Sequence, residues 1–264
     1  FTAAAGAVIS CDFTNTKRPQ ISVSKLTDGG DGSFDFTLTG EGGSTVPVLT
    51  TDGAGHHTWG PTDLTPGDTY TLSESVQGDW VSTFVSCADV SDTSATSFTF
   101  DKLVDPEVGA TFTAPAGAQI QCVFSNTKRP VVMVNKTTVG ATSGEFSFVL
   151  DGSGGSTQPV SVVDGRGQAT WGPEDLEPGL YTLTEDTSTS VGWVSEFNSC
   201  MNLGQSENEA NVGTVLEDGR VGVSLTLVAG DVISCNFTNT QRPEISVVKS
   251  AVGGDGTFDF TLTG

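Results

Sequence analysis

Short runs of alternating apolar and polar residues follow one another along the chain, separated by turns rich in Gly, Asp and Pro. A period of two is typical of strands with one buried face, and helical periodicity is absent. The irregular stretch 201–220 is expected to be an exposed insertion with a hairpin at Asp218-Gly219. The fold class is therefore all-β, and the first half of the chain predicts strands at 20–26, 33–39, 45–50, 57–60, 68–75, 79–87, 109–114 and 118–126.

One phrase of the sequence occurs three times, at residues 11–25, 122–136 and 235–249. The copies lie 111 and 113 residues apart, a period that indicates an array of whole domains. Each phrase is interpreted as the last strand of one module, a short Arg-Pro joint and the first strand of the next. The predicted organisation is the last strand of a preceding module at 1–18, complete sandwich modules at 19–129 and 130–242, and the first strands of a following module at 243–264.

The charge of the chain limits its partners. Acidic residues outnumber basic ones by 32 to 11, for a formal net charge of −21. Such a surface repels nucleic acid and anionic lipid, so neither is expected as a partner. Eight of the 11 basic residues lie inside the three repeated phrases, which indicates a specific role for them there.

The five Cys residues are spaced regularly and form no metal-binding motif. Cys87 and Cys122 are 35 residues apart, and so are Cys200 and Cys235. This spacing favours one disulfide per module and an oxidising, extracellular compartment. Buried free thiols are the alternative. Cys11 is left over, and its partner is expected before residue 1.

Three strands of each module carry one ionisable or amide residue on the face that is otherwise apolar. In the first module these residues are Lys25 on the first strand, Glu74 on a middle strand and Asn126 on the last. Each would be costly to bury alone, so we expect the three to meet in the core. The matching residues of the second module are Lys136, Glu185 and Asn239.

This order of residues resembles the prealbumin-like modules, SpaA-type or Cna B-type, of bacterial surface proteins and pili. The resemblance covers the entire chain. It implies tandem two-sheet, seven-stranded sandwiches of a prealbumin-like or immunoglobulin-like kind, joined by short Pro linkers. It also implies an internal isopeptide bond between the Lys and the Asn, assisted by the Glu. The residues concerned are Lys25, Asn126 and Glu74; Lys136, Asn239 and Glu185; and, with partners outside the chain, Asn15 and Lys249.

The proposed bond requires these three residue types. Burial lowers the pKa of a Lys, so that its neutral amine attacks the Asn side-chain carbonyl. Burial raises the pKa of a Glu, which then hydrogen-bonds the carbonyl and transfers protons as ammonia leaves. The reaction runs once within the chain, so the protein is not expected to be an enzyme with turnover. The alternative is an unreacted Lys–Glu ion pair with the Asn as a strand-end cap.

Other candidate sites are weaker. Asp28, Asp31 and Asp35 form an acidic turn that lacks the full spacing of a calcium loop, so no metal or other cofactor is expected. His56 and His57 are interpreted as exposed loop residues. The four Trp residues are expected in the core or at the sandwich ends rather than on a glycan platform: Trp59, Trp80, Trp171 and Trp193.

The predicted function is a structural section of a repeat protein that is secreted or on the cell surface. Its modules would form a stiff stalk or filament with copies of itself or with adjoining modules, without direct membrane insertion by this segment. The alternative is an adhesin-type binding module that recognises a glycan or a protein through its loops. In that case one set of loops would form a pocket or an aromatic platform.

Overall fold

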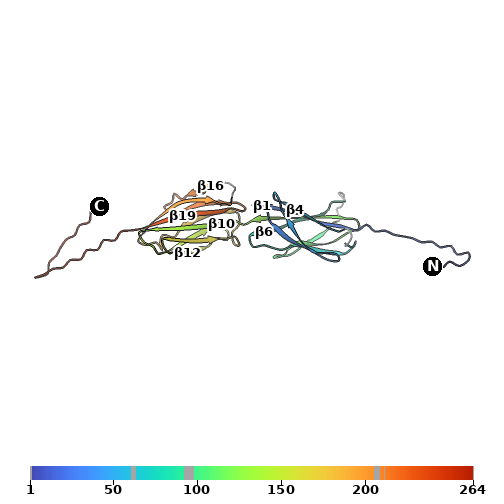
Figure 1. Cartoon of the computed structure of the whole chain (residues 1–264), viewed down its shortest axis with the longest axis horizontal. Coiled ribbons are helices and arrows are strands. Elements are labelled where there is room, and N and C mark those ends of the chain that lie inside the picture. The colour runs from blue at the N-terminus through green and yellow to red at the C-terminus, as the bar shows by residue number, and fades with distance from the viewer. Residues whose placement is uncertain (1, 61–63, 92–97, 205–208, 211, 264) are drawn as a thin grey trace.

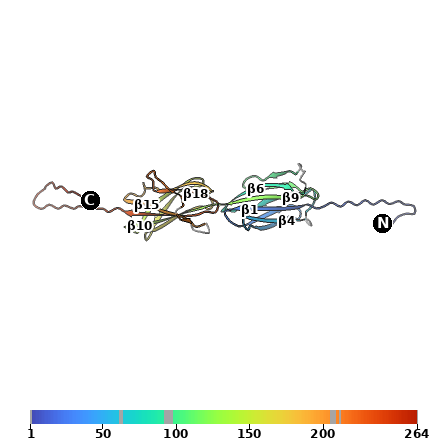
Figure 2. The same ribbon diagram turned by 90° about the horizontal axis from the view of Figure 1, so that it is seen from above.

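The computed structural model of the chain describes residues 2–60, 64–91, 98–204, 209–210 and 212–263. These residues form strands and loops without helices, arranged as two sandwiches that lie end to end along the long axis (Figure 1). Segments 2–19 and 242–263 contain no strand and leave the sandwiches at opposite ends (Figures 1 and 2). None of the described segments is a helix long and apolar enough to cross a membrane.

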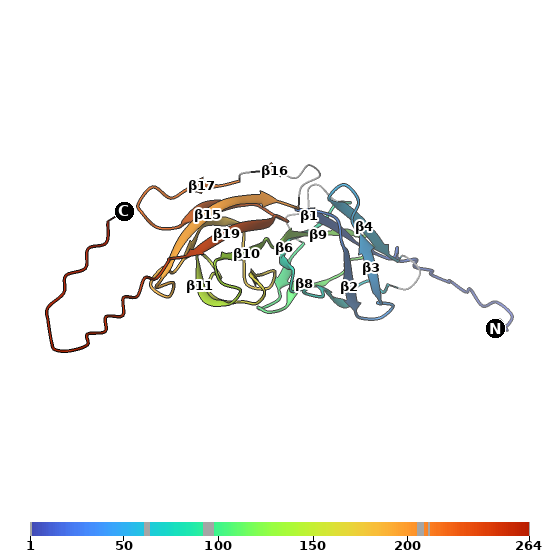
Figure 3. The same cartoon turned by 60° about the vertical axis from the view of Figure 1, so that its left-hand side comes forward.

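The first module contains two sheets that face each other. Their strand orders are β4-β1-β9-β6 and β3-β2-β5-β8-β7. Figure 3 shows β1, β4 and β9 on one side of this module and β2, β3 and β8 on the other. The strands are β1 (Gln20–Asp28), β2 (Ser33–Thr39), β3 (Thr45–Leu49), β4 (Ala54–Trp59), β5 (Thr69–Glu74), β6 (Trp80–Asp89), β7 (Phe100–Lys102), β8 (Val108–Thr113) and β9 (Gln119–Lys128).

The second module repeats this arrangement. Its sheets have the orders β13-β10-β19-β15-β16 and β12-β11-β14-β18-β17. The strands are β10 (Val131–Val139), β11 (Gly144–Asp151), β12 (Thr157–Val162), β13 (Arg166–Trp171), β14 (Gly179–Glu185), β15 (Trp193–Asn202), β16 (Glu209–Ala210), β17 (Thr214–Val215), β18 (Gly222–Leu227) and β19 (Val232–Gln241).

The prediction of tandem two-sheet β modules is confirmed, with two differences in detail. The described residues form nine strands in the first module and ten in the second, above the seven that the resemblance implies, and the short edge strands β7, β16 and β17 are among the additional ones. His56 and His57 lie on β4 rather than in a loop. In the stretch 201–220 the turn at Asp218-Gly219 joins β17 to β18 as expected, whereas 205–208 and 211 lie outside the described residues.

The first and last strands of each module lie side by side in parallel. In the first module Ile21 pairs with Ile120 and Thr27 with Asn126. The alternate residues of both strands are fully buried against the facing sheet, which is why their apolar residues recur with a period of two. A module therefore begins at one end of the sandwich and leaves it at the other.

The Arg-Pro joint between the modules is hydrogen-bonded to the second module. Gly230 N donates to Lys128 O at 3.1 Å, and Val131 N donates to Asp231 O at 2.8 Å. A Cβ atom on Gly29, in the β1–β2 turn of the first module, would lie 2.6 Å from the Ala229 carbonyl carbon, so these turns are in close contact. The joint is thus held on both sides, which restricts its bending.

Candidate functional site

The Lys, Glu and Asn of the first module meet between its two sheets. Lys25 and Asn126 come from the adjacent strands β1 and β9, and Glu74 comes from β5 of the facing sheet. Lys25 Nζ lies 3.0 Å from Glu74 Oε1 and 3.1 Å from Oε2, while Asn126 Nδ2 donates to Oε1 at 2.5 Å. One carboxylate therefore contacts both of the groups that an isopeptide bond would join.

The site is closed to water. Lys25 and Asn126 are 0% exposed, and Glu74 is 4% exposed. Lys25 Nζ lies 4.5 Å from the ring centroid of Phe34, a contact that favours a cation but replaces its hydration only partly. Burial lowers the pKa of Lys25 to about 8, against the opposing effect of the Glu74 charge. Burial also raises the pKa of Glu74, although the contacts with Lys25 and Asn126 oppose the rise.

The second module builds the same arrangement from β10, β14 and β19. Lys136 Nζ donates to Glu185 Oε2 at 3.0 Å and to Asn239 Oδ1 at 2.5 Å. Asn239 Nδ2 donates to Glu185 Oε1 at 2.5 Å. Burial lowers the pKa of Lys136, as it does for Lys25. Here the Lys nitrogen is already in contact with the amide that it would attack.

The two sites differ in the contacts of the Asn carbonyl oxygen. Asn126 Oδ1 is buried without a hydrogen-bond partner, whereas Asn239 Oδ1 accepts from Lys136. A buried carbonyl oxygen without a donor is costly. A protonated Glu74 would supply that donor, in line with the raised pKa of its carboxyl.

Two further residues expected to take part in cross-links, Asn15 and Lys249, are exposed and lie outside the two sandwiches. Lys249 Nζ donates to Ser250 O at 2.9 Å and lies 4.1 Å from the Phe258 ring centroid. The described structure brings neither residue to a Lys–Glu–Asn cluster, so their cross-links stay predictions.

Sequence reasoning missed two hydroxyl groups at the second site. Ser190 Oγ and Ser195 Oγ both donate to Glu185 Oε1, at 3.0 Å and 3.3 Å. The available signal was the length of the segment between the Glu and the following Trp, which is two residues longer in the second module than in the first.

Both expected disulfides are present. Cys87 is bonded to Cys122 and Cys200 to Cys235, in each case across directly opposed positions of neighbouring strands. A β-bulge with Val85 as its extra residue precedes Cys87 on β6. Cys87 is three positions after the buried Phe84, so in a regular strand it would face the other side. The extra residue turns it toward the core. Cys11 is exposed and unpaired.

The weaker candidates have structural roles. The Asp31 carboxylate accepts from the backbone N–H groups of Asp52 and Gly53, at 3.2 and 2.9 Å, and so caps a neighbouring turn. In the part of the chain that is described, no three His, Cys, Asp or Glu side chains are grouped to hold a metal ion. Trp59, Trp80 and Trp171 are buried, and Trp193 packs against the core, as expected.

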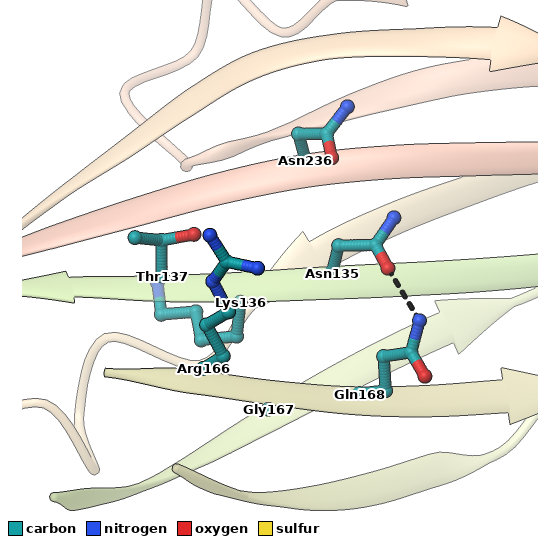
Figure 4. Close-up of a pocket in the computed structure, with 7 residues that line it drawn as sticks. All are labelled: Asn135, Lys136, Thr137, Arg166, Gly167, Gln168 and Asn236. Atoms are coloured by element: carbon teal, nitrogen blue, oxygen red, sulfur yellow. Dashed lines mark hydrogen bonds between the residues drawn. The ribbon is translucent and has the colours of Figure 1, made fainter. Parts of the chain in front are cut away.

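A polar surface pocket of about 560 Å³ lies on the second module, over β10, β13 and β19 (Figure 4). Arg166 lines it together with amide side chains. Gln168 Nε2 donates to Asn135 Oδ1 at 2.6 Å, and Asn135 Nδ2 donates to Ser234 Oγ at 2.8 Å. These amides are thus already paired across the strands, and the pocket is on a sheet face rather than among the loops.

A family model described as a prealbumin-like fold domain matches residues 21–128 and 132–241. Among solved structures, the chain is similar to a major pilin protein (T-13) from Streptococcus pyogenes, with 14% identity and a TM-score of 0.29 over 86% of this chain and 98% of that one. A C-terminal fragment of the pilus adhesin SpaC from Lactobacillus rhamnosus GG gives 14% identity and a TM-score of 0.32, over 86% and 100%.

A third solved structure is an adhesin from Mobiluncus mulieris containing intramolecular disulfide, isopeptide and ester bond cross-links. It gives 12% identity and a TM-score of 0.31, over 81% of this chain and 85% of that one. No curated protein was found to match the chain.

Proposed function

The chain belongs to the family of prealbumin-like fold domains, and we propose that its two modules are a load-bearing section of an extracellular fibre or stalk. Each module is clamped by a Lys–Asn isopeptide bond and by a disulfide. The observation that carries this proposal is the buried carboxylate that contacts both the Lys and the Asn, found twice in one chain. The disulfides support an oxidising, extracellular location.

The bond forms by a single transfer within each module. A proton first passes from the Lys ammonium to the Glu carboxylate. The low-dielectric core favours this transfer because it destabilises both charged groups. The neutral Nζ then attacks the Asn Cγ. As the Nζ–Cγ bond forms and the Cγ–Nδ2 bond breaks, the Glu passes its proton to the departing nitrogen, which leaves as ammonia. The Glu then takes up the second proton that Nζ must lose to become an amide nitrogen. The fold supplies the required proximity.

The position of the bond explains its use. Tension along the fibre enters a module at β1 and leaves at β9, because these strands lead to the joints at either end. Lys25 and Asn126 lie on these two strands, so a bond between them carries the load past nearly the whole module. Noncovalent stability of about 5–15 kcal/mol does not resist sustained load in this way.

The mass of the intact, reduced chain tests the proposal. The wild-type chain should lack two ammonia molecules relative to its sequence. Glu74→Ala should lack one, because the first module loses its proton carrier while the second is untouched. Glu74→Gln, which keeps the volume of the side chain, should also lack one. An unaltered mass for the folded wild-type chain would refute the proposal.

A second candidate function, adhesion to a glycan or a protein, has less support. The described feature that favours it is the pocket beside Arg166, which lies on a sheet face rather than among the loops. In the first module Ala54 and His56 replace Arg166 and Gln168 in the register. Binding of the chain to glycan arrays, compared with Arg166→Ala, tests this alternative. Equal or absent binding by both chains leaves the fibre as the function.

A further inference from the structure

Two serine hydroxyls surround the Glu185 carboxylate in the second module. Ser190 Oγ donates to Glu185 Oε1 at 3.0 Å, and Ser195 Oγ donates to the same atom at 3.3 Å. Asn239 Nδ2 also donates to Oε1, whereas Lys136 Nζ contacts Oε2. Oε1 thus receives three donors, and two of them have no part in the bond itself.

The first module lacks this pair of hydroxyl contacts. Among the described residues, Glu74 receives hydrogen bonds from Lys25 and Asn126 alone. Ser82 is opposite Asn126 in the strand register, as Ser195 is opposite Asn239. The Ser82 hydroxyl is nevertheless buried without a hydrogen-bond partner.

The difference arises in the loop between the Glu and the following Trp. Both loops end in the same backbone turn, in which the Trp N–H donates to the carbonyl oxygen of Gln77 in one module and Ser190 in the other. The Gln77 side chain donates outward to Ser33 O at 2.7 Å. Ser190 is 5% exposed and contacts Glu185. The longer loop of the second module therefore places a hydroxyl group where the first has none.

We propose that Ser190, assisted by Ser195, is a positioning residue that slows cross-linking in the second module, because both hydroxyls donate to the carboxylate that must accept a proton from Lys136. This inference rests on the proposed isopeptide function. A hydroxyl that donates to a carboxylate stabilises the charged form over the acid form. The reaction needs the acid form, because Lys136 must pass a proton to Glu185 before its nitrogen attacks Asn239.

The size of the effect follows from the strength of such a contact. A hydrogen bond to a buried charged group changes the balance between the two protonation states about tenfold. The Lys136–Asn239 bond should accordingly form about tenfold more slowly than the Lys25–Asn126 bond. The two modules of one chain would then mature at different times.

The experiment follows both bonds in the same full-length chain. The chain is synthesised in an oxidising cell-free reaction and quenched in denaturant at intervals, and the two cross-linked peptides are counted by mass spectrometry after digestion. Ser190→Ala should accelerate the Lys136–Asn239 bond about tenfold and leave the first module unchanged. Ser190→Thr, which keeps the hydroxyl, should retain the slow rate. Ser82→Ala is the matched control, because its hydroxyl has no partner.

Comparison of Ser190→Ala with Ser190→Thr separates this role from simple packing. Lys136 is the one charged group in contact with Glu185 among the described residues. Ser190→Thr changes the shape of the side chain but keeps the donor, so its rate should match the wild type and not Ser190→Ala. If Ser190→Ala does not fold, Ser195→Ala should show the same changes to a smaller extent, since its contact is longer.

The possible outcomes are distinct. Equal rates in the two modules, or a slower second bond in Ser190→Ala, would overturn the role of Ser190 while leaving the isopeptide function intact. Absence of both cross-linked peptides from the folded wild-type chain would overturn the isopeptide function, and this inference with it.

Discussion

Stretching a single chain with Glu74 replaced by Gln would test whether the proposed Lys25–Asn126 bond carries load. The substitution keeps the side-chain volume but removes the proton carrier, so the first module should fold, retain its disulfide and stay unreacted. The second module keeps Glu185 and serves as an internal reference. Ser75→Ala, an exposed neighbour of the site, is the matched control.

The expected extension can be worked out from the positions of the bonds. Pro19 and Arg129 are 110 residues apart, and the disulfide closes off the 35 between Cys87 and Cys122. The remaining 75 residues extend to about 255 Å at ~3.4 Å each. Subtracting about 30 Å for the folded length of β1 leaves a gain of about 225 Å. Reduction of the disulfide should add about 120 Å.

Force spectroscopy measures these steps directly. The cross-linked wild-type module should show no step, because only residues 19–25 and 126–129 lie outside the bond. Glu74→Gln should show one step of about 225 Å, lengthened after reduction. A wild-type chain that has lost two ammonia molecules and still gives this step would refute the claim that the bond bears the load.

Three further predictions concern unreacted modules. In the Glu74→Gln background, replacing Cys87 and Cys122 by Ser should lower the free energy of unfolding by about 3–4 kcal/mol, measured by chemical denaturation, because a 35-residue loop is no longer closed; no change would show that the disulfide leaves the unfolded state unrestricted. Burial lowers the pKa of Lys25 from 10.5 to about 8, and Asn126→Ala keeps this amine unreacted, so the unfolded state of the variant should bind more protons between these values. Stability should therefore rise from pH 8 to pH 10.5, and a fall in the denaturation midpoint over that range would contradict the assigned shift. In the Glu74→Gln background, Gly109→Ala should cost at least about 2 kcal/mol in the same assay, because its Cβ would lie 2.1 Å from the Leu72 carbonyl oxygen. Gly67→Ala, also at positive φ but with open space around it, should cost about 1 kcal/mol. Equal losses of stability in the two variants would mean that the backbone conformation, and not the steric contact at Gly109, sets the cost.

Much of the fold could be predicted because, in a β-sandwich, the alternation of apolar and polar residues follows directly from the burial of one face of each strand. Residues 33–39 were predicted as a strand with the bounds that β2 has, and every other predicted strand of the first module overlaps an observed one. The edge strand β7 was missed because its three residues are too few to show a period and are all exposed. The bulge at Val85 was missed because no residue type in the sequence identifies the extra residue of such a bulge.

The candidate site was predictable as a set of residues but not as a set of contacts. The repeat identified Lys25, Glu74 and Asn126, since each stands on an apolar face at the same place in two modules. The hydroxyls at Glu185 were not predictable in this way, because Ser190 belongs to a loop whose sequence is not repeated. A comparison of repeated sequences cannot predict contacts that are made in one module and not in the other.

The parallel pairing of the first and last strands also sets the order in which a newly made module becomes complete. β9 is the last strand to be synthesised, yet it lies in the interior of its sheet, between β1 and β6. Until it emerges, β1 lacks its parallel neighbour and β6 has no partner in the sheet. Such long-range pairing folds late and slowly. The sheet β4-β1-β9-β6 is therefore incomplete until the final residues of the module have been synthesised.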